Sequence, residues 1–174
     1  GVMNAVDAIL TGQVENAFCA TRPPGHHATH DVGMGFCVFN HVAVGARYAQ
    51  KKYDVERIAI IDWDVHHGNG TQDIFYEDGS VFYFSTHQSP WYPHTGYRSE
   101  TGEGKGEGTI LNAPFPAGTA MKDIQLAFKD GFLKAMREFK PDLVVISAGF
   151  DSREADPLGQ FLLTDADFRE LTKL

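Results

Sequence analysis

Apolar residues give way to polar, metal-binding types within one stretch, Ile58-Ala59-Ile60-Ile61-Asp62-Trp63-Asp64-Val65-His66-His67-Gly68-Asn69-Gly70. Its first four residues form a short, mostly β-branched run, typical of a strand buried on both faces of a parallel sheet. The rest holds two Asp, two His and two Gly within nine residues. In open α/β sheets, ligands bind beyond the carboxyl ends of the strands. The stretch therefore predicts a buried strand that leads directly into a functional site.

Two further apolar runs show the same change from apolar to polar. Val81–Phe84 is followed by Ser85-Thr86-His87, and Leu143–Ile146 is followed by Ser147-Ala148-Gly149-Phe150-Asp151. A weaker strand candidate is Ala17–Ala20. Parallel strands end at the same edge of a sheet, so the three polar segments are expected to meet at one active-site mouth.

Helical patterns separate the predicted strands. Apolar residues recur at helical spacing over 39–52 and 121–139, and the second pattern stops before Pro141. Thr164 has the side chain of an N-cap for a last helix that holds Phe168 and Leu171. Strands alternating with helices predict an α/β fold, an open and mainly parallel β-sheet with helices on both faces.

Length and composition limit the class of protein. The 174 residues suit one domain, with 43% hydrophobic and 22% charged residues. A net charge of −8 argues against direct binding to nucleic acid or to an anionic membrane surface. Two cysteines, no signal-peptide pattern and no membrane-length apolar run predict a cytoplasmic protein, or a nuclear one if the source is eukaryotic. Both ends fall within a pattern, so an incomplete domain is expected.

The residues after the first strand have the chemistry of a metal site. In extended backbone Asp62, Asp64 and His66 project from one face, and zinc accepts both carboxylate and imidazole. Asp151, after the third strand, is the natural further ligand, and such a set leaves a position open for water. Single Asp and His residues more often cap helices or form salt bridges, but so dense a cluster favours a metal. Fe²⁺ or Co²⁺ would also fit these ligands.

A second cluster, Arg22-Pro23-Pro24-Gly25-His26-His27-Ala28, places two histidines after a rigid turn. A histidine with a near-neutral pKa can take a proton from water and deliver it to a leaving amine. A carboxylate such as Asp62 could fix the tautomer of one of them. The alternative is an exposed loop with incidental histidines.

Four motifs in order resemble the histone deacetylase superfamily across essentially the whole chain. They are residues 22–28, Gly35-Phe36-Cys37 with Asn40, residues 62–72, and Ser147 to Asp151 with Asp156-Pro157. The forms Arg-Pro-Pro-Gly and Asp-Trp-Asp-Val are most similar to class II enzymes and to bacterial deacetylase-like amidohydrolases. The resemblance implies that residues 1–174 are the central part of a single zinc-dependent deacetylase domain, truncated at both ends.

The resemblance also implies roles for individual residues. The zinc ligands correspond to Asp64, His66 and Asp151. The active-site histidines correspond to His26 and His27, the second as general base, and their partners to Asp62 and Asn69. Class I enzymes carry Asp where Asn69 stands, so His27 is expected to be less basic than in those enzymes. The acetyl-lysine channel corresponds to Gly35, Phe36 and Tyr92, and a structural K⁺ site to Asp62, Asp64, His66, Ser85 and Thr86.

Three functions remain open at this point. The resemblance implies a deacetylase that acts on acetyl-lysine in histones or other proteins. An acetylpolyamine amidohydrolase shares the same motifs, and the Gly-rich segment Gln88–Gly108 would shape the channel rim that separates the two. The family's oxyanion-stabilising Tyr or His motif has no counterpart in this chain, so a non-catalytic acetyl-lysine binder is the third. Whether the protein is an oligomer stays open under all three.

Overall fold

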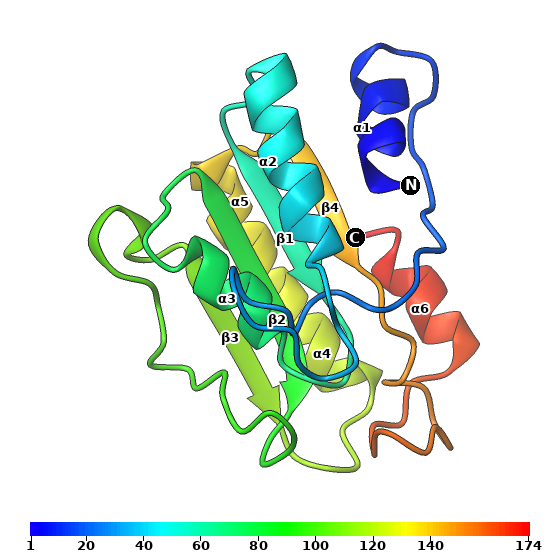
Figure 1. The fold of residues 1–174 in the computed structure, drawn as a ribbon. Coiled ribbons are helices and arrows are strands. Elements are labelled where there is room, and N and C mark those ends of the chain that lie inside the picture. The colour runs from blue at the N-terminus through cyan, green and yellow to red at the C-terminus, as the bar shows by residue number, and fades with distance from the viewer.

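Four parallel strands form the centre of the computed structural model, which describes residues 1–174 (Figure 1). Their order across the sheet is β3 (Ile110–Phe115), β2 (Val81–Gln88), β1 (Ile58–Asp62) and β4 (Leu143–Ser147). All pairings are parallel, and Asp62 lies opposite Ser85 on one side and Ser147 on the other. The predicted α/β class and the three predicted strands are confirmed.

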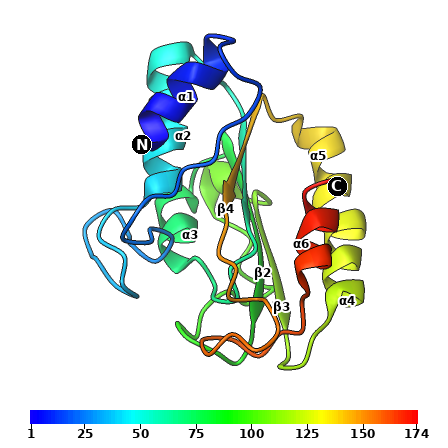
Figure 2. The same cartoon turned by 90° about the vertical axis from the view of Figure 1, so that its right-hand side faces the viewer.

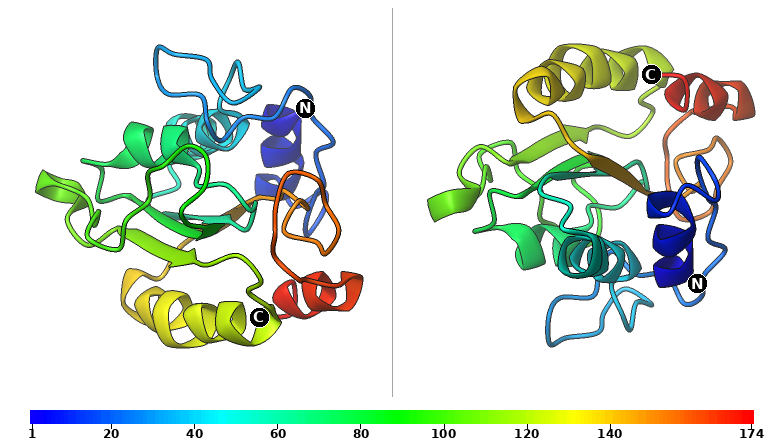
Figure 3. Two further views of the ribbon diagram at one scale, coloured as in Figure 1. Left: turned by 90° about the horizontal axis from the view of Figure 1, so that it is seen from below. Right: turned by 90° about the horizontal axis from the view of Figure 1, so that it is seen from above.

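Helices cover both faces of the sheet (Figure 2). One face carries α1 (Val2–Leu10), α2 (His41–Tyr53) and α3 (Asn69–Phe75). The other carries α4 (Met121–Leu126), a π-helical segment η2 (Ala127–Phe132), α5 (Leu133–Phe139) and α6 (Asp165–Leu171). Views along the sheet show the same two layers (Figure 3). A short 3₁₀ turn, η1 (Gly104–Gly106), lies in the loop between β2 and β3. No helix combines the length and apolar character that a membrane crossing requires.

Alternation along the strands divides the interior into two cores. Ile58 and Ile60 of β1 pack with Tyr83 under α2, whereas Ala59 and Ile61 face the α4–α5 layer. In that second core the rings of Phe84 and Phe132 stack with centroids 5.1 Å apart. Trp63 and Val65, which follow β1, belong to the second core as well, so their side chains point away from the polar residues between them.

Three features differ from the sequence-based expectation. Residues Ala17–Ala20 form no strand, and Phe18 is 77% exposed, so the short apolar run finds no sheet partner. The segment 85–87 does not follow β2 but lies inside it, because pairing with β3 continues to Gln88. The strand β3 was not predicted because Pro114 interrupts its pattern. The helix α3 was not predicted because Gly68 and Gly70, at its start, obscure its pattern.

The carboxyl ends of the strands point to the end of the molecule where the 20–40 and 148–164 loops lie (Figure 1). The first of these loops is tied to the fold by Asn40, the N-cap of α2, whose side chain accepts a hydrogen bond from the Ala43 amide at 3.1 Å. Asn40 Nδ2 also donates to Ala28 O at 3.1 Å and to Thr71 Oγ1 at 3.0 Å. One buried side chain therefore joins α2, α3 and the histidine-containing loop.

We expect Asn40→Ala to lower the free energy of unfolding by about 2–4 kcal/mol, because it removes a cap and two buried hydrogen bonds. Chemical denaturation followed by circular dichroism measures this change. Asn4→Ala on the exposed face of α1 is the matched control, and it should stay within about 0.5 kcal/mol of the unsubstituted chain. A loss at Asn40 no larger than in the control would contradict the structural role given to this residue.

Candidate active site

Asp64, His66 and Asp151 converge at the carboxyl end of the sheet. His66 Nδ1 lies 2.9 Å from Asp64 Oδ1 and 3.0 Å from Asp151 Oδ2. One possible ligand atom from each residue lies within 4.8 Å of the others. Asp64 and His66 follow β1 and Asp151 follows β4, and these strands are adjacent and in register. The parallel topology thus brings together three residues that are separated by up to 87 positions (151 − 64).

The backbone around the three side chains fixes their orientation. Asp151 Oδ1 accepts from the Val65 amide at 2.9 Å, which leaves its second oxygen facing His66. Asp64 Oδ1 accepts from the His66 amide at 2.8 Å. Gly149 lies directly against Asp64, and a Cβ at this position would stand 2.0 Å from Asp64 Oδ2. Contacts within the fold therefore orient both carboxylates.

The two histidines of the second motif lie beside this cluster and are buried. His26 Nδ1 is 2.9 Å from Asp62 Oδ2, and His27 Nδ1 is 2.8 Å from Asn69 Oδ1. Asn69 Nδ2 donates to Met34 Sδ at 3.4 Å, an atom that can only accept, so the amide oxygen is the group that faces His27. His27 then carries its proton on Nδ1, which leaves the Nε2 lone pair free.

The surroundings of the two histidines shift their pKa values in opposite directions. Burial lowers the pKa of His26, but the carboxylates of Asp62 and Asp64 more than offset this effect and raise it to about 9. Burial also lowers the pKa of His27, and the positive charge of His26, with ring centroids 4.0 Å apart, adds to this and brings it to about 4. His26 is therefore protonated at neutral pH and His27 is not. The hydrogen bond that His27 Nδ1 donates to Asn69 raises the pKa of His27, so the low basicity originates in burial and in the charge of His26.

The two carboxylates favour a positive charge on the imidazole of His66. Burial lowers the pKa of His66, but hydrogen bonds to Asp151 and Asp64 outweigh it and raise the pKa to about 10. Burial raises the pKa of Asp64, yet the positive charges of His26 and His66 bring it below its ordinary value. Two carboxylates around one imidazole thus form an anionic site that attracts a positive charge. The donor set and its geometry suit a divalent first-row metal.

Metal binding to this site is expected to release about one proton per ion at pH 7. Imidazole binds metal only when the coordinating nitrogen is unprotonated, and His66 stays protonated below its raised pKa of about 10. Metal affinity should therefore rise about tenfold per pH unit between pH 6 and 8. Calorimetric titration with zinc in two buffers of different ionisation enthalpy measures the proton count. A count near zero would show that the proton does not occupy the site.

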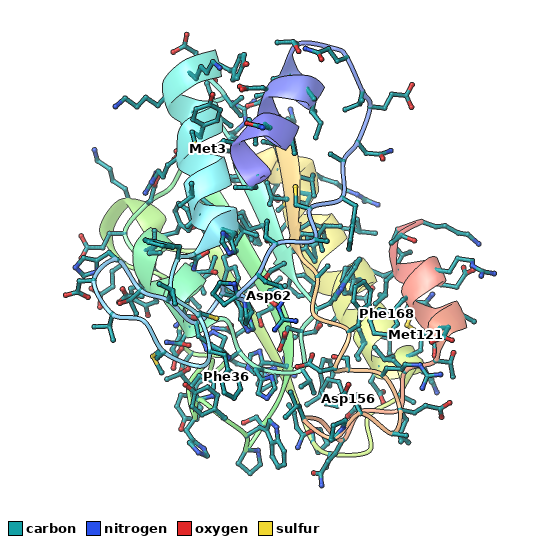
Figure 4. All side chains as sticks on the ribbon, turned by 45° about the vertical axis from the view of Figure 1, so that its right-hand side comes forward. Met3, Phe36, Asp62, Met121, Asp156 and Phe168 are labelled. Carbon is teal, nitrogen blue, oxygen red and sulfur yellow. The ribbon has the colours of Figure 1, made fainter.

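The predicted channel residues lie around His27, with one exception. The ring of Tyr92 meets His27 edge-on at 5.1 Å and His66 at 6.2 Å between centroids. Gly35 packs closely against His27, since a Cβ at this position would lie 2.2 Å from His27 Cδ2. Phe36 is 83% exposed, whereas Asp62 is fully buried, and both are labelled in Figure 4. The exposure of Phe36 sets it apart from the buried His27.

The residues expected to hold potassium are also close together. Ser85 is the β2 neighbour of Asp62, and both side chains are fully buried. Thr86 follows Ser85 within β2 and is buried as well. Ser85 Oγ lies 2.9 Å from His87 Nδ1.

Sequence reasoning missed several residues of the site region. Glu100, Gln72 and Asn112 form a buried polar network with His67 and His87 beneath the loop between β2 and β3. Asn112 belongs to a strand that the sequence did not reveal, and Gln72 to an unpredicted helix. The loop composition gave the one available signal, because a long Gly-rich segment in a small domain is usually functional.

The fold and the site together define a class of protein. The structure superposes on the "Crystal Structure of HDA15 HD domain" with a TM-score of 0.95 and 43% sequence identity, over 99% of this chain and 51% of that one. The family model described as "Histone deacetylase domain" matches residues 1–174. This chain belongs to the histone deacetylase domain family.

Individual relatives are similar over nearly the whole chain. A "Probable deacetylase" of Archaeoglobus fulgidus is 44% identical over 173 residues, which cover 99% of this chain and 48% of that protein. "Histone deacetylase 14, chloroplastic" of Arabidopsis thaliana is 48% identical over 176 residues, which cover 98% of this chain and 42% of that protein. "Polyamine deacetylase HDAC10" of Rattus norvegicus is 45% identical over 179 residues, which cover 99% of this chain and 30% of that protein. The chain spans about half of these relatives' length or less.

Proposed function

We propose that residues 1–174 are the central part of a single zinc-dependent deacetylase domain that hydrolyses the acetyl amide of acetyl-lysine side chains. The observation that carries this proposal is the neutral, buried His27 beside a metal-type set of Asp64, His66 and Asp151. A general base adjacent to an electrophile-binding site is the arrangement that metal-assisted amide hydrolysis requires.

Asp64, His66 and Asp151 would hold the zinc, and Fe²⁺ or Co²⁺ would suit the same ligands. When bound, the metal supplies a Lewis acid that polarises the acetyl carbonyl and lowers the pKa of water. We further assign a structural K⁺ to the buried region of Asp62, Asp64, His66, Ser85 and Thr86. Its positive charge would balance part of the negative charge of Asp62, which is fully buried, and of Asp64, which is partly buried.

His27 is the proposed general base. Its Nε2 lone pair is free because Nδ1 donates to Asn69, and its low pKa keeps it unprotonated before reaction. After it takes the proton of the attacking water, the same nitrogen can deliver that proton to the leaving amine. His26 is already protonated and hydrogen-bonded to Asp62, so it cannot accept this proton and instead contributes positive charge close to the reacting carbonyl.

The substrate side chain would enter past Phe36, Gly35 and Tyr92. An aromatic wall such as Tyr92 suits the aliphatic part of acetyl-lysine, since apolar surface is buried without loss of a hydrogen bond. An acetylated polyamine has the same aliphatic and acetyl groups. The 45% identity to proteins named polyamine deacetylase favours it as the second candidate substrate.

Hydrolysis of two acetylated substrates tests the proposal. The zinc-loaded chain is offered an acetyl-lysine peptide and N-acetylspermidine, and acetate release is followed in each case. Release from the peptide at the higher kcat/KM supports the acetyl-lysine proposal, and the opposite preference supports the polyamine. Binding of the peptide without acetate release would indicate a non-catalytic acetyl-lysine binder. A zinc-loaded chain that neither binds nor hydrolyses either substrate would contradict both enzymatic proposals.

A further inference from the structure

A buried polar network beneath the loop between β2 and β3 takes no part in the proposed chemistry. It joins α3, β2 and β3 to the loop residue Glu100 through His67, Gln72, His87 and Asn112. All four of these partners are buried. Buried polar groups are costly unless they are hydrogen-bonded, so a network of this size needs a structural or functional reason.

Gln72 is the centre of the network. Its Oε1 lies 3.0 Å from His67 Nε2 and accepts from Asn112 Nδ2 at 2.7 Å. An amide oxygen can only accept, so His67 carries its proton on Nε2 and its Nδ1 accepts from Thr95 Oγ1 at 2.7 Å. The amide group of Gln72 is then oriented with Nε2 toward Glu100. Each polar contact fixes the direction of the next.

Glu100 connects this network to the loop. Its Oε2 accepts from Gln72 Nε2 at 2.6 Å and from the Gly96 amide at 3.1 Å. The Gly96 carbonyl in turn lies 2.9 Å from His87 Nε2. Both backbone polar groups of Gly96 are thus paired with the network. A carboxylate that accepts from two donors forms stronger hydrogen bonds than a neutral acceptor does.

The backbone of Gly96 lies directly on the two imidazoles. A Cβ at this position would be 2.5 Å from His87 Nε2 and 2.6 Å from His67 Cγ. Its φ of +86° is also one that side-chain-bearing residues rarely adopt. The loop is therefore fixed against the sheet at Gly96 by close packing and by hydrogen bonds together.

A second attachment holds the loop on the other side of Tyr92. Trp91 Nε1 donates to Leu158 O at 2.9 Å, a contact with the loop that follows β4. Tyr92 therefore lies between two fixed points, Trp91 and Gly96, and its ring rests 5.1 Å from that of His27. Tyr92 itself is 40% exposed, so burial alone does not determine where its ring lies.

We propose that Glu100 is a positioning residue that holds Tyr92 against His27 by fixing Gly96 to Gln72. The substrate-facing wall of the site then depends on a carboxylate that touches neither the substrate nor the candidate metal ligands. The assignment of Tyr92 as a channel wall rests on the proposed function. The link from Glu100 through Gly96 to Tyr92 rests on geometry alone, so the two parts can be tested separately.

The first test observes the ring contact and needs no activity. In the metal-free chain, nuclear Overhauser contacts between the Tyr92 and His27 rings and the exchange rate of the Gly96 amide are compared among variants. Glu100→Ala should remove the ring contact and raise the exchange rate at least about tenfold, as expected for the loss of two hydrogen bonds. Glu100→Gln retains an acceptor and should preserve both signals. Glu103→Ala, an exposed glutamate of the same loop, is the control.

The second test is a double-mutant cycle in the zinc-loaded chain, with the dissociation constant of an acetyl-lysine peptide as the readout. Glu100→Ala should weaken binding about tenfold in the unsubstituted background and by less than about twofold in the Tyr92→Ala background. A residue that only stabilises the fold would have equal effects in both backgrounds.

The outcomes separate the two parts of the account. A ring contact that persists in Glu100→Ala, or equal effects on binding in both backgrounds, would overturn the positioning role. If the ring contact is lost in Glu100→Ala but the unsubstituted chain binds no peptide, the positioning role stands and the proposed function fails. A variant that unfolds would be recognised from its thermal melt. Gln72→Glu, which places a second carboxylate against Glu100, then tests the same link.

Discussion

Replacing His27 with alanine is expected to lower the kcat of acetyl-lysine hydrolysis by about 10²–10⁴-fold, the usual contribution of a general base. The expectation follows from the unprotonated Nε2 that the Asn69 contact and the charged His26 maintain. His27 is not among the three candidate ligands, so the variant should still bind zinc. Steady-state kinetics and metal content measured on the same preparation test both statements.

His30→Ala is the matched control for this prediction. His30 belongs to the same loop, but its side chain is 75% exposed and its contacts are with Asp31 and Asp73 at the surface. Its loss should change kcat by less than about twofold. If His27→Ala hydrolysed the peptide as fast as the control, a different group would have to accept the proton.

Gly149→Ala is expected to reduce zinc affinity at least about 100-fold, although the residue is not itself a ligand. The added Cβ would stand 2.0 Å from Asp64 Oδ2 and 2.5 Å from Asp64 Cβ, closer than non-bonded atoms approach. Asp64 must then rotate or shift, and a displacement of this size separates it from His66 and Asp151. Competition titration with a zinc-binding dye measures the change in affinity.

The control for Gly149 is Gly131→Ala, within the helical layer behind the sheet. There the new Cβ meets one side-chain tip, Leu111 Cδ2, at 3.3 Å. Zinc affinity should be unchanged in this variant, and helix propensity favours alanine. Equal zinc affinity in Gly149→Ala and the unsubstituted chain would mean that Asp64 does not need the orientation seen here.

The sequence allowed the central strand and its polar extension to be predicted because both signals are local. A short apolar run ending in Asp and His residues specifies a buried strand and a site at its carboxyl end. Trp63 and Val65 alternate with the ligands along the chain and lie in the core, as expected when successive side chains point to opposite faces. The meeting of His66 with Asp151 was anticipated from topology, since parallel neighbours end together.

What could not be predicted depends on contacts between distant segments. The strand β3 holds Asn112 and Pro114, which weaken its apolar pattern, and its pairing with β2 determines that the strand forms. The difference in pKa between His26 and His27 arises from burial and from the charges around them, not from residue type. The Gly96 backbone is hydrogen-bonded to the side chains of Glu100 and His87, and no sequence pattern indicates that these three residues meet.

Metal stoichiometry is the most direct test of the account. The purified chain, an Asp151→Ala variant and a Glu154→Ala control from the same loop are each equilibrated with zinc, dialysed and analysed for metal and protein. The account predicts one zinc per chain in the unsubstituted protein and in the control, and none in Asp151→Ala. A folded chain that retains no zinc, or an Asp151→Ala variant that still retains one, would contradict the site proposed at the ends of β1 and β4.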